Sequence, residues 1–262
     1  MARATLGRRL GVLLVVATLA ACARPSPRTS GEVFELDSFR WRAEATPQGV
    51  IVATNEWGDL RVRTAHRGGL VVSAMIQKIG TTRDELEIRV EEAAERVVVR
   101  VVPRVAEPRG RVDLTLIVPP GKRLEGTTRD GLAEIKYKGD VVARTRRGNV
   151  LIETPAHASA HSETGGITAK LSGKAWQQAL SFVSGSGDIT IWLPEDANLV
   201  LRAATGGAID VGFPQVAGSG GRGTPRVETL GHGGPELRID SVHGDVRIVP
   251  YPVAITAPKR AE

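Results

Sequence analysis

The sequence predicts an all-β protein built as a single-chain β-solenoid, in which short strands stack as parallel coils. Apolar and polar residues alternate with a period of two over many short runs, as they do in half-buried strands. The 262 residues include 30 glycines and only 4% aromatic residues, which favours short strands and tight turns over helices. In the C-terminal half, a glycine opens a strand-like run about every 20 residues, and such a period is typical of a solenoid.

The first 21 residues have the layout of a secretory signal peptide. Three arginines precede an apolar run that ends at Ala21 and is shorter than the ~20 residues that span a bilayer. Residues 19–22 read Leu-Ala-Ala-Cys and resemble the lipobox of bacterial lipoproteins, in which the cysteine is acylated and becomes the N-terminus. We therefore predict palmitate-type lipidation of Cys22 and a Pro- and Ser-rich tether over residues 22–32.

Composition excludes several classes of site. Cys22 is the only cysteine, so once it carries lipid the chain has no thiol for a disulfide, a metal site or a nucleophile. The signal peptide holds three of the 35 basic residues and none of the 29 acidic ones, which leaves a mature net charge of +3. That balance is too mild to favour nucleic acid as a partner.

Residues 33–111 are predicted to form the N-terminal β-strand part of the solenoid, as a meander or irregular first coils. Leu60 and Val62 alternate with two arginines, as expected for a strand with one buried face. The segment Glu91–Glu95 is predicted to be a turn that joins a hairpin. The next run, Val97–Val102, is predicted to be a buried strand that ends at Pro103.

Residues 112–250 are predicted to form the repetitive solenoid, with a tail over residues 251–262. Each inward aliphatic side chain would contribute roughly 1.5–3 kcal/mol by burial. Glycines at the corners would leave room for the neighbouring coil or adopt positive φ, and the hydroxyls before them would bond to turn backbone. Gly218–Pro235 is predicted to be a flexible excursion between coils. The predicted corner hydroxyls are Thr145, Thr164, Ser184, Ser186 and Thr205. The predicted inward residues, coil by coil, are Val150, Ile152; Ile167, Ala169, Leu171; Ile189, Ile191, Leu193; Ile209, Val211, Phe213; and, closing the stack, Val246, Ile248.

Three stretches stand out along the chain, namely Val112–Ile135, Ser184–Pro194 and Gly233–Pro250. In this order they resemble the bacterial putative adhesin family, a domain-of-unknown-function group, and the related GIN head domain, and the resemblance covers roughly residues 50–250. It implies a solenoid of short strands, no known catalytic residues and a role at the cell surface or in the envelope. The chain departs from the simplest pattern at Lys174–Leu180, where the alternating pattern of a strand is weak.

Metal and cofactor sites are not predicted. His157 and His161 would lie on one face of a helix, but in an extended segment they are ~13 Å apart, too far to share one ion. Aspartates after glycine, at positions 59, 140, 188 and 245, are predicted to cap tight turns by bonding their own backbone rather than to bind calcium. The glycine-rich run at 218–223 has no helix after it, so it forms no nucleotide cradle.

The candidate binding surface comes from a basic stretch, Lys122–Arg147, and one outward aromatic residue. Outward basic side chains on stacked strands could form a band for anionic lipid, glycan phosphate or acidic glycans, or simply a solvated face of mixed charge. Trp192 lies between two inward residues and should point outward, where it could stack on a sugar or be covered by a loop. The candidate residues are Lys136, Lys138, Arg144, Arg146, Arg147 and Trp192.

Three functions remain open at this point. The first is a non-enzymatic scaffold or binding module for protein or glycan, anchored in the cell envelope. The second is an envelope-stress or regulatory partner, docking through the basic band or the glycine-rich excursion. The third is an enzyme acting on polysaccharide, which would need two carboxylates in one groove. The acidic residues to test are Glu153, Glu163, Asp188 and Asp210.

The residue after Cys22 bears on localisation. Alanine at this position favours the outer membrane in a host with two membranes, and otherwise the outer face of the cell membrane. The sequence leaves the oligomeric state open.

Overall fold

A computed structural model of the chain describes residues 34–43, 49–81, 83–93, 95–173, 176–216 and 222–252, all within the unit Val33–Glu262. Every regular element in these ranges is a β-strand, so the protein is all-β as predicted. In the described ranges, no helix is long and apolar enough to cross a membrane. Cys22, the tether and most of the tail lie outside the described residues. The strands are β1 (Phe34–Arg42), β2 (Val50–Asn55), β3 (Leu60–Thr64), β4 (Val71–Ile79), β5 (Leu86–Ala93), β6 (Arg96–Pro103), β7 (Arg111–Val118), β8 (Leu124–Thr128), β9 (Ala133–Lys136), β10 (Val141–Thr145), β11 (Val150–Thr154), β12 (Ala158–Ser162), β13 (Ile167–Leu171), β14 (Leu180–Ser184), β15 (Ile189–Pro194), β16 (Leu199–Thr205), β17 (Ile209–Val211), β18 (Arg226–Leu230), β19 (Glu236–Ser241) and β20 (Val246–Tyr251).

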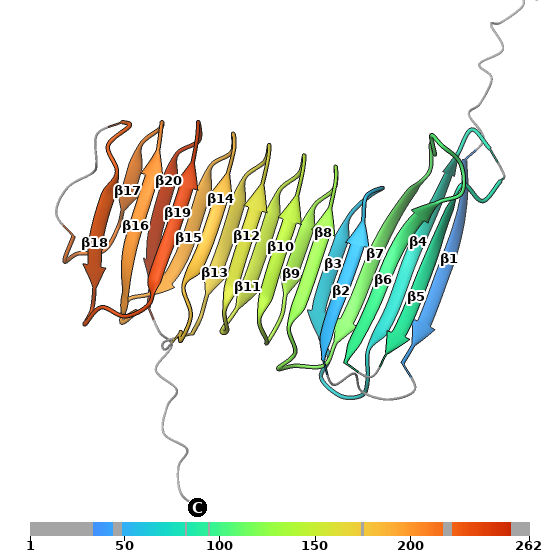
Figure 1. The fold of residues 1–262 in the computed structure, drawn as a ribbon, viewed down its shortest axis with the longest axis horizontal. Coiled ribbons are helices and arrows are strands. Elements are labelled where there is room, and N and C mark those ends of the chain that lie inside the picture. Colours follow the sequence, from blue (N-terminus) through green and yellow to red (C-terminus); the bar gives the residue numbers. More distant parts are fainter. Residues whose placement is uncertain are drawn as a thin grey trace, which may run out of the picture. The chain divides into compact units, whose positions relative to one another are not determined.

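The strands form two ten-stranded sheets with the core between them (Figure 1). Sheet A has the order β1-β4-β7-β3-β9-β11-β13-β15-β20-β17, and sheet B has the order β18-β16-β19-β14-β12-β10-β8-β2-β6-β5. From β8 to β15 the chain crosses from one sheet to the other at each turn, so one strand from each sheet makes a rung. Successive rungs pair in parallel with offsets of 17, 17 and 22 residues, as the registers Leu124↔Val141, Val141↔Ala158 and Ser159↔Ser181 show.

At both ends, the spatial order of the rungs differs from their order in the chain. The rung β19–β20 lies between β14–β15 and β16–β17, so the prediction that Val246 and Ile248 close the stack is wrong. At the other end, the rung β6–β7 pairs with the outer side of β2–β3. Each outer rung can then be capped by strands of the opposite direction.

Antiparallel strands provide these caps. β4 and then β1 extend sheet A beyond β7, and β5 extends sheet B beyond β6. At the far end β18 pairs with β16, so the predicted excursion 218–235 contains a strand instead. The hairpin predicted around Glu91–Glu95 is confirmed as β5–β6, although Glu91 to Ala93 belong to β5.

The inner faces of both sheets bury the aliphatic side chains that the alternation predicts. Every inward residue listed above, from Val150 to Ile248, is buried, as are Leu60, Val62 and the alternate residues of β7. β6 is buried except at its ends and at Arg100. The period-two pattern therefore identifies the core correctly along most of the stack.

A ladder of buried polar side chains lies beside this core, at the last residue of successive sheet-B strands. The ladder runs in register through Asn55, Thr128, Thr145, Ser162, Ser184, Ser241 and Thr205. Its hydroxyls donate to turn carbonyls, for example from Ser162 to Gly148 (3.2 Å) and from Ser241 to Gly187 (2.9 Å). The predicted corner role is thereby confirmed for Thr145, Ser184 and Thr205. Thr164, in the turn after β12, likewise donates to the carbonyl oxygen of Arg146 (3.3 Å). Because a buried unpaired carbonyl is costly, these bonds fix the turn beside each strand.

The corner glycines are needed mainly because neighbouring turns approach closely. A Cβ added at Gly187 would lie 2.2 Å from the carbonyl oxygen of Gly165, and one at Gly165 would lie 2.1 Å from that of Gly148. Neither residue has a positive φ. Of the two reasons predicted for corner glycines, room for the next rung is the one that applies here.

Candidate functional site

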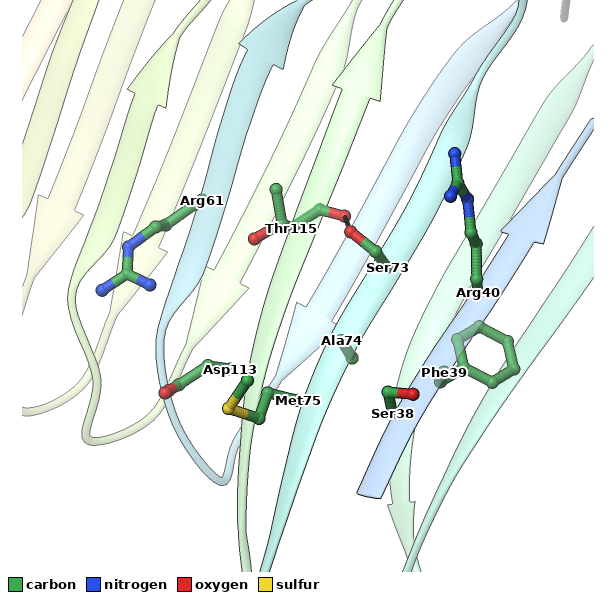
Figure 2. Close-up of a pocket in the computed structure, with 9 residues that line it drawn as sticks. All are labelled: Ser38, Phe39, Arg40, Arg61, Ser73, Ala74, Met75, Asp113 and Thr115. Atoms are coloured by element: carbon green, nitrogen blue, oxygen red, sulfur yellow. Dashed lines mark hydrogen bonds between the residues drawn. The ribbon is translucent and has the colours of Figure 1, made fainter. Parts of the chain in front are cut away.

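A shallow hollow of about 450 Å³ lies on the outer face of sheet A, over β1, β4, β7 and β3 (Figure 2). Its volume falls within the range of small-ligand pockets, ~300–1,000 Å³. The lining residues are Ser38, Phe39, Arg40, Arg61, Ser73, Ala74, Met75, Asp113 and Thr115.

Strand register explains why the sheet is hollowed at this point. Arg40 pairs with Ser73, Ser73 with Thr115, and Thr115 with Arg61, so one outward row crosses four strands. Two short hydroxyl side chains therefore lie between two long arginines. In the next outward row Met75 lies between Ser38 and Asp113 and is 50% exposed. The result is a trough with a hydroxyl floor, cationic ends and an apolar side.

The two arginines differ in their electrostatic state. Arg61 contacts Asp59 at 3.2 Å and Glu134 at 3.8 Å. The exposed Arg40 makes no hydrogen bond or ion pair with any residue in the described part of the chain. Among the described residues, nothing therefore compensates the guanidinium of Arg40 at the β1 end of the hollow.

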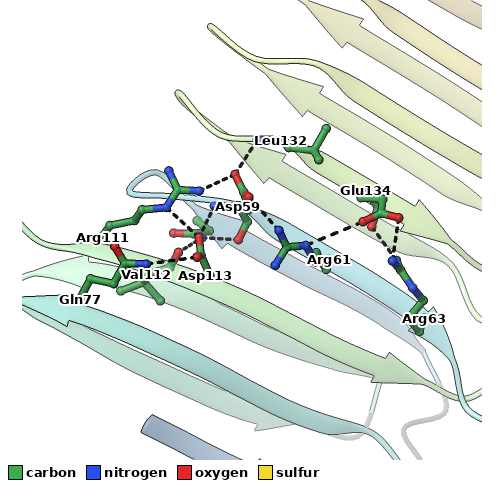
Figure 3. Close-up of polar contacts among 10 residues, drawn as sticks. Asp59, Arg61, Arg63, Gln77, Arg111, Val112, Asp113, Leu132 and Glu134 are labelled. Atoms are coloured by element: carbon green, nitrogen blue, oxygen red, sulfur yellow. Dashed lines mark hydrogen bonds and ion pairs between the residues drawn. The ribbon is translucent and has the colours of Figure 1, made fainter. Parts of the chain in front are cut away.

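A network of charged groups holds the β3 side of the hollow in place (Figure 3). At its centre, Asp59 accepts hydrogen bonds from Arg111 (2.7 Å) and from the backbone N–H of Leu132 (3.0 Å). Asp113 accepts from Arg111 (2.9 Å) and from the backbone N–H of Asp59 (3.3 Å). Burial alone would lower the pKa of Arg111, but the hydrogen bond to Asp59 and the charges of both aspartates raise it. Strands β3, β7 and β9 are therefore tied together beside the hollow.

The six binding residues predicted from the sequence do not gather on one face. Lys136 (β9) and Trp192 (β15) are outward on sheet A, whereas Arg144 is outward on sheet B, in β10. Arg146 and Arg147 lie in the turn after β10, and Lys138 lies in the turn after β9. No single basic band is formed from them.

Several of these residues have ionic partners. Arg146 pairs with Glu163 (3.3 Å), Arg147 with Asp130 (2.6 Å), and Lys136 with Glu153 (3.7 Å). Lys136 and Lys138 line a second hollow of about 350 Å³, where Glu153 pairs with Lys136. Trp192 is 38% exposed, which confirms its outward direction.

The turn aspartates bond to neighbouring rungs rather than to their own turns, which corrects the prediction. Asp188 accepts from the N–H of Asp245, and Asp245 accepts from that of Ala208, each at 2.8 Å. Asp140 likewise accepts from His157 (3.2 Å). Parallel rungs are only ~4.8 Å apart, so the amide of the next rung lies within reach of each carboxylate.

The remaining candidates for metal binding or catalysis are two histidines and a group of aspartates that line one hollow. His157 Nε2 is 2.8 Å from the carbonyl oxygen of Ala179, and His161 is exposed on β12. Asp188, Asp210 and Asp245 line a small hollow of about 130 Å³. In the described residues, no group of three or more His, Cys, Asp or Glu side chains is arranged to hold a metal ion.

Comparison with known proteins was made at three levels. No protein-family model matches the chain, and no curated protein matches it. The chain is similar to a solved structure of a putative cell adhesion protein from Clostridium sporogenes, with 13% identity, a TM-score of 0.48, and coverage of 83% of this chain and 100% of that one. It is also similar to a putative adhesin from Bacteroides fragilis (9% identity, TM-score 0.35, 82% and 97% coverage) and one from Parabacteroides merdae (9%, 0.27, 83% and 96%). Identities and TM-scores this low assign neither family nor function, so we infer function from the residues of this chain alone.

Proposed function

We propose that the protein is a non-enzymatic binding module of the bacterial cell envelope, held at the membrane by lipid on Cys22. Residues 22–32 would then link the lipid to β1, the strand that forms one wall of the hollow. Eleven residues reach at most ~40 Å when fully extended. The module would thus stay close to the membrane, at the outer membrane in a host with two membranes and at the outer face of the cell membrane otherwise.

The observation that carries this proposal is the hollow on sheet A. It combines Arg40, a cation with no partner in the part of the chain that the structure describes, with two hydroxyl side chains and an exposed methionine on four hydrogen-bonded strands. Sites on regular elements hold their geometry better than sites on loops. A rigid, open trough that sets a cation and hydroxyls beside apolar surface suits a sugar chain, which has both hydroxyls and C–H faces, so we propose glycan as the ligand.

The state of the acidic residues supports a role without catalysis. Glu153 faces Lys136, Glu163 faces Arg146, and Asp210 faces Arg247 at 3.6 Å. Asp188 accepts a backbone hydrogen bond from the next rung. A pair of catalytic carboxylates needs both groups in one groove at ~5–9.5 Å. Asp188 and Asp210 do line one hollow of about 130 Å³, but each already has a partner there, the N–H of Asp245 and the guanidinium of Arg247.

Membrane attachment is tested by the Cys22→Ser variant. The wild-type protein should fractionate with membranes, and the variant should move to the soluble fraction because it lacks the lipid. Continued membrane fractionation of Cys22→Ser would contradict the anchor.

The binding role is tested on a glycan array with the full-length protein and a variant whose hollow is filled. Thr115→Arg places a long side chain on the floor of the hollow and should abolish glycan retention. Ser159→Arg makes the same addition at an outward position of β12, in sheet B, and should leave retention unchanged. An array on which the wild type retains nothing, or on which both variants bind alike, would contradict the proposal.

A further inference from the structure

We propose that the hollow selects glycans that carry a carboxylate, and that this carboxylate binds the guanidinium of Arg40. This inference rests on the proposed binding role and adds the ligand class to it. It depends on three features of the hollow, namely the guanidinium of Arg40, the hydroxyl floor and the nearby carboxylate of Asp113.

Arg40 is suited to a carboxylate by its position and its lack of partners. It is exposed on β1, at the end of the row that continues through Ser73 and Thr115, and it has no ion pair within the described ranges. A guanidinium binds a planar carboxylate through two parallel N–H···O bonds, which adds specificity to the charge attraction. A neutral sugar would leave this group without a partner.

The floor of the hollow is suited to the rest of a sugar chain. Ser73 Oγ donates to the carbonyl oxygen of Thr115 at 3.5 Å, whereas Thr115 Oγ1 has no hydrogen bond to any residue that the structure describes. From β1 to β3 there are three inter-strand spacings of ~4.8 Å, or roughly 14 Å. The exposed Met75 provides an apolar surface along this path. Sugar hydroxyls can therefore meet Thr115 while the C–H face of the ring covers Met75.

The other charges argue against phosphate and strongly anionic polymers. Arg61 and Arg111 are already paired with acids, and the carboxylate of Asp113 lines the same hollow. A phosphate group brings a charge near −2 at neutral pH, and a polyanion gains affinity by contacting many free cations. Of the described cations that line the hollow, only Arg40 lacks an acidic partner, and one anion lies nearby, so the hollow fits a single carboxylate best.

The test is an array of uronic-acid and sialic-acid oligosaccharides, each printed beside its carboxyl-esterified form, with sulfated and phosphorylated sugars added. The full-length protein should retain carboxylated sugars and lose roughly tenfold or more in affinity for the esters. Arg40→Gln should lose the same preference for the acids. Arg42→Gln, with the same charge change two residues along β1 and outside the hollow, should retain it.

Each outcome decides the inference. Equal retention of acids and esters, equal loss in both arginine variants, or a preference for phosphorylated or sulfated sugars would overturn carboxylate selection while leaving a glycan-binding module in place. Retention of no sugar at all would overturn the binding role and the inference together. A melting temperature of Arg40→Gln equal to that of the wild type would show that its loss of binding is local.

Discussion

The buried hydroxyl ladder predicts a large effect from a small change, Ser184→Ala. Ser184 is fully buried at the end of β14, where its Oγ donates to the carbonyl of Gly165 (3.0 Å) and accepts from the N–H of Gly187 (2.8 Å). Alanine removes both bonds, and a buried backbone group left unpaired costs ~1–3 kcal/mol. Because both glycines are half-buried, water compensates part of this cost. We expect a loss of about 2 kcal/mol in the free energy of unfolding, or roughly 4–8 °C in Tm.

The same strand offers a matched control. Ser181 is also in β14 but points outward and makes no hydrogen bond through its side chain to any described residue, so Ser181→Ala should change stability by no more than ~0.5 kcal/mol. Urea and thermal unfolding followed by far-UV circular dichroism would measure both variants. Ser184→Thr should recover part of the loss, because threonine occupies the equivalent place in β10 and β16. If Ser184→Ala unfolds at the same urea concentration as Ser181→Ala, the ladder does not stabilise the turns.

Three further predictions concern ionisation and rung order. Lys78 lies 2.9 Å from Asp84 and also near Glu35 and Asp37, and its hydrogen bond to Asp84 lowers the pKa of that carboxyl below 3.8. Lys78→Met should therefore be less stable than wild type at neutral pH. The difference in urea midpoint between the two proteins should vanish as pH falls through the lowered pKa of Asp84. A difference that does not depend on pH would contradict the ion pair. Burial raises the pKa of Tyr137 to about 12, so in Tyr251→Phe, which has no other tyrosine, phenolate absorbance should appear near pH 12. The contribution of neutral Tyr137 to the free energy of unfolding should be complete below pH ~10 and decline above it. A midpoint near pH 10 for the phenol of Tyr137 would contradict its burial. Ending the chain after Gly234 removes β19–β20, the rung that lies between β14–β15 and β16–β17. The amides of Leu199–Thr205 should then lose protection from hydrogen exchange. Protection equal to that of the wild type would contradict the observed order of the rungs.

Much of the fold could be predicted from the sequence because burial in a strand alternates with a period of two. That rule identified Ile189, Ile191 and Leu193 as inward, and all three are fully buried in β15. It also predicted the outward direction of Trp192. Such assignments need only local information, since one buried face is enough to fix the pattern along a strand.

The order of the rungs could not be predicted in this way, because alternation does not say which strand lies beside which. Residues 246–251 have the pattern of any inward strand, yet they pair with β15 on one side and β17 on the other. The hydrogen bond from the N–H of Asp245 to Asp188 belongs to this insertion and joins residues 57 positions apart. For the same reason, local sequence predicts that the turn aspartates bond their own backbone, because a bond across rungs can be predicted only when the neighbouring rung is known.

The candidate site depends on the same non-sequential neighbours. Alternation places Arg61 and Thr115 on outward faces, but they meet only because β7 lies between β4 and β3, which also brings Ser73 beside Thr115. Closeness in the chain instead predicts that the basic candidates lie together, but the crossing between sheets at each turn separates Lys136 on sheet A from Arg144 on sheet B. Because neighbours on a solenoid surface come from adjacent rungs, its surface sites can be predicted only once the order of the rungs is known.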